Sequence, residues 1–207
     1  MSDAVTVLGY RFAPGARRFA FPLLVASVPA VSLGVAPGLA LAAAGVAVLL
    51  FYRDPQRSPP PGGVLAPADG RVSVVRAEGD RLRVGVFMSP TDVHVNRSPL
   101  AGTVAAVDHE PGGHRPAFDK EAESNERVHV DLGDCEVTLI AGAFARRITP
   151  YVDQGDELDR GERIGHIAFG SRADVLLPPA VDRDGLRVAT GDRVRAGESV
   201  LARFPPD

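Results

Sequence analysis

The chain has 207 residues, a formal net charge of −3 and an isoelectric point of about 6.0. This charge balance gives no basis for a nucleic-acid-binding surface. Cys135 is the only cysteine, which excludes a disulfide within the chain and a cysteine-based zinc site, and no other metal site is expected. The length suits one domain with an appendage.

The first predicted element is an apolar hairpin within residues 1–56. The 34 residues from Phe19 to Tyr52 carry no charge, and the turn-forming dipeptide Pro37-Gly38 interrupts them. Two apolar arms result, 19–36 and 39–52, and both are shorter than the roughly 20 residues that span a bilayer. We therefore expect a helical hairpin that either spans a thin membrane or inserts as a re-entrant wedge.

Arginines stand on both sides of this hairpin. Because basic residues favour the cytoplasmic side, the chain is expected at the cytoplasmic face of the plasma membrane, peripheral or anchored by the hairpin. A secretory signal peptide is disfavoured because the apolar region is too long and too interrupted. A buried hairpin of a soluble protein is the remaining alternative. The flanking arginines are Arg11, Arg17, Arg18, Arg53 and Arg57.

Residues 57–207 are predicted to form a β-rich domain. A Pro/Gly connector, RSPPPGG, precedes short β-branched runs separated by Gly, Asp and Pro, which is the pattern of many short strands. Two internal repeats occur: GDELDRGERIG at 155–165 matches GDRVRAGESVL at 191–201, and APADGRV at 66–72 resembles SPLAGTV at 98–104. We expect a mainly β, α+β fold, a compact β-sandwich similar to the barrel-sandwich hybrid of biotinyl and lipoyl carrier domains.

That similarity raises one alternative function, a membrane-anchored, non-catalytic binding module of the biotinyl or lipoyl type. Such carriers need a lysine on an exposed hairpin. Lys120, the only lysine, lies instead in the polar stretch FDKEAESNER, with no repeat around it. A carrier function is therefore disfavoured.

Candidate chemical groups gather in the segment FMSPTDVHVNRSPLAG. It leaves an apolar strand, turns at Ser89-Pro90 and then presents four polar residues between two prolines, a setting in which folds display functional groups. A charged hairpin tip is the alternative interpretation. The four residues are Asp92, His94, Asn96 and Arg97.

The remaining candidates have simple structural interpretations when taken singly. Asp69 lies in a Pro-Ala-Asp-Gly turn, where an aspartate often caps the turn by itself. The other four histidines are expected as loop or strand residues, and they are His109, His114, His129 and His166.

Five blocks nevertheless occur in order and at natural distances: FYRDP, APADGRV, FMSPTDVHVNRSPLAGTV, NER and FGSRADVLLP. Together they resemble the phosphatidylserine decarboxylase proenzymes of the short, prokaryotic (archaeal) type. The resemblance covers about Phe51 to Pro178, and the apolar hairpin ahead of it also suits that family.

The resemblance implies a self-processing enzyme cut between Gly170 and Ser171. A β chain, residues 1–170, and an α chain, residues 171–207, would stay together as a heterodimer, and further assembly is left open. Ser171 would become a covalent pyruvoyl cofactor that forms a Schiff base with the head group of phosphatidylserine and releases CO₂, giving phosphatidylethanolamine. An archaeal ether lipid with the same head group would serve equally, and a soluble amino-acid decarboxylase is disfavoured by the anchor.

The resemblance also suggests residue roles. Because a serine hydroxyl needs a base before it attacks, His94 is expected to take the Ser171 proton, with Asp69 fixing the histidine tautomer. Longer family members carry a second histidine where Arg97 stands here, so His94 serves both steps or another group, His129 and His166 included, shares them. Arg97 is a candidate contact for the lipid phosphate or carboxylate. Further candidate phosphate contacts are Lys120, Asn125 and Arg127.

Overall fold

The structure is a computed structural model that describes residues 5–7, 9–113, 125–142, 148–168 and 171–205. The chain divides into two compact units, Met1–Gln56 and Arg57–Asp207. The first unit contains an apolar helix pair and the second is built from strands, which confirms the predicted mainly β, α+β fold class.

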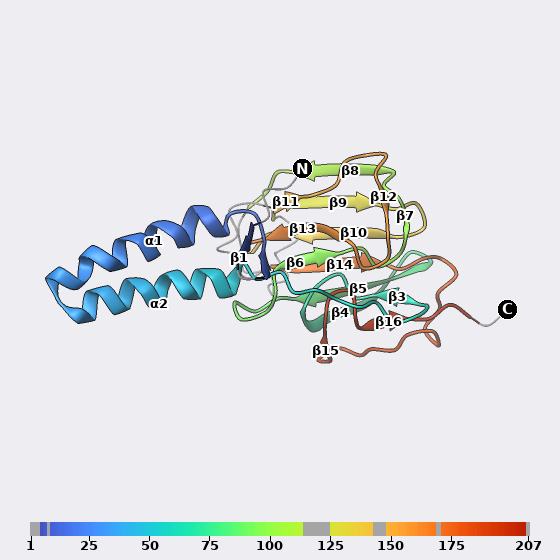
Figure 1. Ribbon diagram of the computed structural model, residues 1–207. Helices are drawn as coiled ribbons and strands as arrows, with labels where there is room; N and C mark the ends of the chain where they lie inside the picture. The colour runs from blue at the N-terminus through green and yellow to red at the C-terminus, as the bar shows by residue number, and fades with distance from the viewer. Residues whose placement is uncertain (1–4, 8, 114–124, 143–147, 169–170, 206–207) are drawn as a thin grey trace. The chain divides into compact units, whose positions relative to one another are not determined.

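The first unit begins with a short β-hairpin, β1 (Val5–Val7) and β2 (Tyr10–Phe12). Helix α1 (Ala16–Ala30) continues into a 3-10 turn, η1 (Val31–Leu33), and α2 (Val35–Phe51) returns beside it (Figure 1). The chain reverses at Gly34, whose φ is 136°, so the predicted reversal at Pro37-Gly38 is wrong. Pro37 lies in the first turn of α2, where backbone N–H groups have no acceptor within the helix, so the N–H that proline lacks is not needed there.

Glycines allow the two helices to approach closely. A Cβ added at Gly38 would meet the Val31 side chain at 2.6 Å, and one added at Gly45 would meet the Leu24 side chain at 2.7 Å. Small residues at such contacts are typical of helices that pack in membranes. Gly38 therefore serves helix packing rather than chain reversal.

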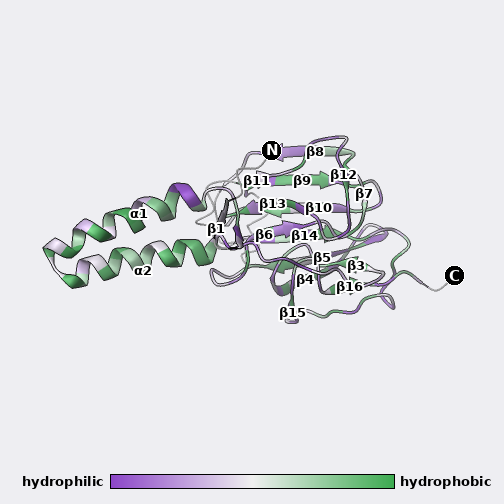
Figure 2. Cartoon of the chain, viewed as in Figure 1, coloured by the Kyte–Doolittle hydropathy of each residue, from purple (hydrophilic) through white to green (hydrophobic). Residues whose placement is uncertain are grey.

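Apolar side chains cover the outside of this helix pair (Figure 2). Val28 is 74% exposed and Leu33 is 85% exposed. Among the described residues, Ala16–Leu33 is the helical stretch long and apolar enough to cross a membrane, whereas Val35–Phe51 is shorter. Exposed apolar surface of this kind is typical of a membrane or partner contact, so the helix pair has the properties of an anchor.

The largest sheet among the described residues of the second unit has seven antiparallel strands. Their order is β15 (Arg193–Val194), β4 (Gly70–Glu78), β5 (Arg81–Phe87), β14 (Arg172–Leu176), β10 (Glu136–Ile140), β9 (Arg127–Asp131) and β8 (Ala106–Glu110). A three-stranded sheet joins β11 (Ile148–Pro150), β13 (Arg163–Ile167) and β6 (Val95–Arg97). Two further pairs join β12 (Glu157–Leu158) to β7 (Gly102–Thr103) and β16 (Val200–Ala202) to β3 (Val64–Leu65).

Alternation along the strands gives the large sheet one apolar and one polar face. On β14, Ala173 and Val175 are fully buried in the core, while Arg172 and Asp174 point to the other face. Neighbouring strands contribute Val84 and Val86 from β5, and Val137 and Leu139 from β10, to the same core. A residue just before Arg172 therefore points toward the core side.

The two sequence repeats fold into two equivalent strand–turn–strand units. Gly161 and Gly197, which occupy the same position in each repeat, have φ values of 82° and 71° and contact each other. Each repeat unit makes the same two backbone hydrogen bonds. In the first, Val104 N–H donates to Asp156 O at 2.9 Å and Gly155 N–H donates to Val104 O at 2.8 Å. In the second, Val72 N–H donates to Asp192 O at 2.9 Å and Gly191 N–H donates to Val72 O at 2.8 Å. These matched bonds confirm the predicted internal repeat.

Candidate active site

Ser171 lies immediately before β14 and is fully buried. Its carbonyl oxygen accepts a hydrogen bond from Met88 N–H at 2.9 Å, which extends the pairing of β5 with β14 by one step. Its hydroxyl Oγ lies 4.0 Å from the Met88 sulfur, a weak acceptor. Both the main chain and the side chain of Ser171 therefore contact Met88. Gly170, the other half of the predicted cleavage site, lies outside the described residues.

His94 immediately precedes β6 and is 2% exposed. Its Nδ1 lies 2.9 Å from the carbonyl oxygen of Asp92. Because a carbonyl oxygen only accepts hydrogen bonds, Nδ1 carries the proton of the neutral ring and Nε2 keeps its lone pair. This tautomer is the one in which Nε2 can act as a general base.

The turn ahead of His94 is held by the Asp92 side chain. The Asp92 carboxylate accepts hydrogen bonds from Ser89 N–H at 2.8 Å and from the Ser89 hydroxyl at 2.6 Å. Asp92 N–H returns a bond to the Ser89 carbonyl at 3.0 Å. The predicted turn at Ser89-Pro90 is therefore present, and it positions the carbonyl that orients the His94 ring.

Asp69 lies in a different set of contacts from the one expected. Its carboxylate accepts hydrogen bonds from the Arg57 guanidinium at 2.7 Å and from Ala196 N–H at 2.8 Å. Burial raises the pKa of Asp69, and the charge of Arg57 opposes this effect. The expected hydrogen bond from the His94 ring to the Asp69 carboxylate is not present among the described residues, because His94 Nδ1 donates to the Asp92 carbonyl oxygen instead. A catalytic role for Asp69 stays a prediction.

The candidate phosphate contacts that the structure describes on β6 and before β9 are buried. Arg97 is 4% exposed and donates to the carbonyl oxygen of Gly161 at 2.9 Å. Asn125 is 3% exposed and donates to the carbonyl oxygen of Ala141 at 2.7 Å. Phosphate binding by either residue stays a prediction, and Lys120 lies outside the described residues.

Asn96 belongs to this site, although sequence reasoning assigned it no role. It is fully buried, and its Nδ2 lies 3.4 Å from the Pro67 carbonyl oxygen and 3.7 Å from the Met88 sulfur. Its Oδ1 has no hydrogen-bond partner among the described residues. The only sequence signal is its place in the polar segment with His94, since burial and a missing partner are visible only in three dimensions.

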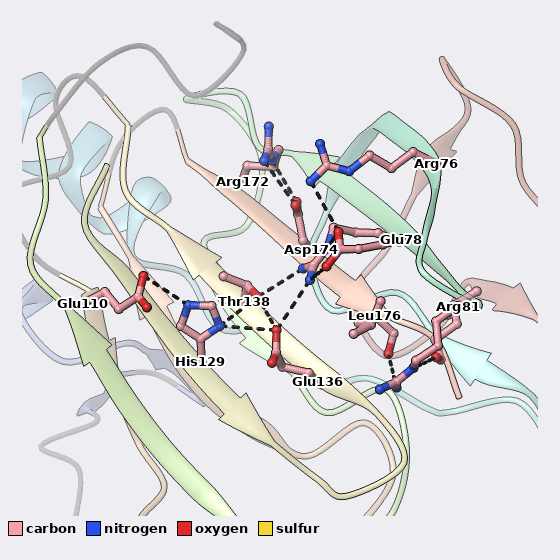
Figure 3. Close-up of polar contacts among 12 residues, drawn as sticks. Arg76, Glu78, Arg81, Glu110, His129, Glu136, Thr138, Arg172, Asp174 and Leu176 are labelled. Carbon is pink, nitrogen blue, oxygen red and sulfur yellow. Dashed lines mark hydrogen bonds and ion pairs between the residues drawn. The ribbon is translucent and has the colours of Figure 1, made fainter. Parts of the chain in front are cut away.

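A second polar cluster occupies the other face of the large sheet (Figure 3). Arg83 on β5 reaches across β14 to Thr138 on β10 at 3.2 Å, and Glu136 lies 3.3 Å from His129 Nδ1. The hydrogen bond from His129 lowers the pKa of Glu136 to about 2, and Glu136 in turn raises the pKa of His129. These groups interact with one another on the face opposite the core, which separates His129 from the Ser171 side chain.

His166 lies closer to the site, on the strand that pairs with β6. The adjacent Ile167 N–H donates to the His94 carbonyl oxygen at 3.3 Å. The His166 ring is nearly buried, and its Nδ1 lies 2.9 Å from the Tyr151 hydroxyl. Burial lowers the pKa of His166 to about 4, so its ring is neutral at pH 7.

These contacts place a buried serine and an asparagine amide against Met88. His94, in the tautomer that leaves Nε2 basic, lies two residues before that asparagine on the same segment. No hydrogen bond joins His94 to Ser171 among the described residues, so the attack requires the Ser171 hydroxyl to turn from the Met88 sulfur toward a base. Hydrogen bonds of catalytic groups are often long before reaction. The arrangement suits an attack by the serine hydroxyl on the peptide bond that precedes it.

Comparisons with known proteins show which family the chain resembles. A family model described as phosphatidylserine decarboxylase matches residues 45–202, which include Asp69, His94 and Ser171. The putative archaetidylserine decarboxylase proenzyme of Halobacterium salinarum is 56% identical over 191 residues, covering 92% of this chain and 97% of the relative. The phosphatidylserine decarboxylase proenzyme of Streptomyces coelicolor is 47% identical over 211 residues, covering 96% of this chain and 94% of the relative.

Proposed function

The chain belongs to the phosphatidylserine decarboxylase family, and on this premise we propose that it is a self-processing, pyruvoyl-dependent phosphatidylserine decarboxylase. The proenzyme cleaves itself between Gly170 and Ser171 into a β chain, 1–170, and an α chain, 171–207. The two chains stay together because β14 of the α chain pairs with β5 and β10 of the β chain. The mature enzyme releases the head-group carboxylate of phosphatidylserine as CO₂ and leaves phosphatidylethanolamine.

The cleavage uses the groups around Ser171. His94 Nε2 takes the hydroxyl proton while Ser171 Oγ attacks the carbonyl carbon of Gly170. The peptide C–N bond breaks, and an ester joins Gly170 to Oγ. Loss of the Ser171 α-proton then expels the Gly170 carboxylate and leaves a dehydroalanine at residue 171. Water hydrolyses this dehydroalanine, and its amino nitrogen leaves as ammonia. The α chain then begins with a pyruvoyl group.

The surroundings of Ser171 fit that group. Its ketone carbon and methyl group derive from the serine Cα and Cβ, so the space against Met88 needs no enlargement. Met88 N–H, 2.9 Å from the Ser171 carbonyl oxygen, polarises the amide that adjoins the ketone. When present, the pyruvoyl group supplies an electron sink after it condenses with the amine of the head group.

A membrane-bound substrate explains the apolar helix pair. Because phosphatidylserine stays in the bilayer, an anchored enzyme meets it at the interface, and the flanking arginines favour the cytoplasmic face of the plasma membrane. Washing membranes with alkaline carbonate tests this placement. The protein should remain with the membranes, and release into the soluble fraction contradicts an anchor.

One observation carries the proposal: the serine at the proposed cleavage site is fully buried and packs against Met88, on the core side of the large sheet. Intact mass and a denaturing gel provide the test. The wild type should give two fragments, with the smaller beginning at residue 171 and blocked to Edman degradation, whereas Ser171→Ala should stay a single chain. Ser98→Ala, which alters another buried serine whose hydroxyl donates to the Leu100 carbonyl, should still be cleaved.

Two outcomes contradict the proposal in different ways. An uncut wild-type chain that still decarboxylates the lipid rules out the pyruvoyl mechanism. An uncut, inactive chain favours the non-catalytic binding module. Assays with diacyl and with archaeal ether lipids that share the serine head group then identify the preferred tails, since the relatives carry both names.

A further inference from the structure

Asn96 is a buried amide with an unused acceptor. It lies on β6, two residues after His94, and has no exposed surface. Its Oδ1 has no hydrogen-bond partner among the described residues. Leaving a buried amide oxygen unpaired lowers stability, and such exceptions in folded proteins call for an explanation.

The orientation of this amide follows from its neighbours. Nδ2 faces the Pro67 carbonyl oxygen at 3.4 Å. The reversed orientation would place Oδ1 against that carbonyl, so that two acceptors would be in contact. Pro67 does not need the Asn96 donor, because its carbonyl also accepts from Arg97 N–H at 2.9 Å. The unpaired atom is therefore Oδ1, and the amide is held only by long contacts.

Asn96 and Ser171 share one neighbour. The Met88 sulfur lies 3.7 Å from Asn96 Nδ2 and 4.0 Å from Ser171 Oγ. All three residues are fully buried, so bulk water does not supply the missing donor in the uncleaved chain. The Ser171 hydroxyl is not a lasting donor either, because its oxygen leaves with Gly170 during processing.

We propose that Asn96 Oδ1 accepts a hydrogen bond from the amine of the substrate head group and holds that amine at residue 171; this assignment rests on the proposed decarboxylase function. A serine head group joined to a lipid phosphate presents a carboxylate, a phosphodiester and an amine. The first two only accept hydrogen bonds at neutral pH, whereas the amine donates. The bond to Oδ1 would use an N–H of the neutral amine and would leave its lone pair free to react with the ketone carbon that derives from Ser171 Cα.

Asn96→Leu tests the assignment because leucine has a similar volume and no acceptor. The variant should cleave normally and should melt at or above the wild-type temperature, since no partner is orphaned. Its kcat/KM for the serine lipid should fall roughly 10- to 100-fold, the loss expected for one hydrogen bond to a reacting group. Thr138→Val is the matched control, because it removes a buried hydroxyl that bonds Arg83 and Glu136 on the other face. It should lower the melting temperature and leave kcat/KM unchanged.

A second measurement isolates recognition of the amine. Ethanolamine and choline lipids compete with the substrate, but the choline nitrogen has no N–H to donate. In the wild type the ethanolamine lipid should inhibit more strongly, and in Asn96→Leu the ratio of the two inhibition constants should shrink roughly 10-fold or more. If the ethanolamine amine also reacts with the enzyme, that reaction strengthens inhibition equally in the wild type and in Asn96→Leu. The change in the ratio of inhibition constants between the two proteins therefore measures the contribution of Asn96.

Each failure has a distinct meaning. A cleaved Asn96→Leu enzyme with wild-type kcat/KM and an unchanged inhibition ratio overturns the assignment and leaves the decarboxylase function intact. A folded but uncut variant places Asn96 in self-cleavage instead and also overturns it. If Asn96→Leu does not fold, Asn96→Ala is tested the same way, and failure of both to yield cleaved protein shows that the amide is structural. A wild type that never cleaves refutes the function itself.

Discussion

At the scale of single residues, the proposed catalysis depends on the orientation of the His94 ring. In many hydrolases a carboxylate fixes the tautomer of the catalytic histidine. Here the Asp92 carbonyl does so at 2.9 Å, and Asp69 pairs with Arg57 instead. A carbonyl carries no full charge, so it orients the ring while stabilising the imidazolium less than a carboxylate does. The Asp92 carbonyl therefore leaves Nε2 as the ring nitrogen available to take a proton.

His94→Gln tests that base. Glutamine is polar and of similar reach but does not take a proton near neutral pH, so self-cleavage should slow roughly 100- to 10,000-fold. The fraction of uncut chain is followed by gel densitometry after cell-free synthesis. His109→Gln is the control, because His109 is exposed and pairs only with Glu126 among the described residues. Cleavage of His94→Gln at the wild-type rate would show that another group removes the Ser171 proton.

The sequence singled out some residues of the candidate site but not their contacts. Sequence reasoning located Ser171 and His94 because both lie in blocks that resemble a known family. It paired Asp69 with His94 by analogy and missed Arg57, since a contact between residues 57 and 69 depends on how the connector folds back. Asn96 stood in the polar segment without a role, because an unpaired atom cannot be read from residue types.

At the scale of elements, the repeats were predictable and the hairpin turn was not. Matching glycines at fixed spacing indicate matching turns, and the structure shows equivalent bonds in both copies. The dipeptide Pro37-Gly38 also predicted a turn from local sequence alone. Proline is tolerated in the first turn of a helix, however, and glycine is favoured where two helices pack closely. Gly34, with a φ of 136°, makes the turn instead. A Pro-Gly dipeptide can therefore mark either a turn or a helix contact, and the local sequence does not show how the helices pack.

Gly197→Ala and Gly191→Ala form a matched pair that tests how closely the Arg97 side chain packs against the second repeat. Both glycines have positive φ, 71° and 99°, so both alanines carry a similar backbone strain. A Cβ at Gly197 would lie 2.9 Å from Arg97 Cδ, whereas nothing lies within 4 Å of one at Gly191. Gly197→Ala should therefore lose about 1–3 kcal/mol more stability, the cost of local overpacking.

Denaturant unfolding of the two variants, followed by circular dichroism in detergent, measures the difference. The Ser171→Ala background keeps each chain uncut, so that unfolding involves one polypeptide. Equal losses in the two variants would mean that the Arg97 side chain moves aside for a methyl group at position 197 without a measurable cost.

At the scale of the whole molecule, the strand pairing of the large sheet accounts for how the two proposed chains would stay together after cleavage. The proposed cleavage before residue 171 would free the chain just ahead of β14, while the strand itself would keep its pairing with β5 and β10. The α chain also supplies β15 and β16, which pair with β4 and β3 of the β chain. The fold would thus keep every one of these strands after the proposed cut, and the carbonyl of residue 171 would stay paired with Met88 N–H.

Two histidines should give the stability of this molecule opposite pH dependences. Burial lowers the pKa of His166 to about 4, below its unfolded value near 6.5, so the folded state binds that proton less readily. Stability from this group is therefore complete above about pH 6.5 and falls as the pH drops toward 4, by about 3 kcal/mol in all. His129 behaves in the opposite way, because Glu136 raises its pKa. Its contribution is complete below about pH 6.5 and is lost as the pH rises through the raised value.

Unfolding free energies at pH 5 and pH 8, again in the Ser171→Ala background, separate the two groups. His166→Gln should remove part of the acid-induced loss, so its stability relative to the parent chain should improve from pH 8 to pH 5. His129→Gln should show the reverse trend, because at pH 5 it lacks a charged partner for Glu136 and Glu110, while Arg127 nearby weakens the effect. Below pH 4.5 protonation of Glu136, whose folded pKa is about 2, adds a further loss in the parent chain. Parallel pH profiles for both variants and the parent would mean that neither ring changes its proton affinity on folding.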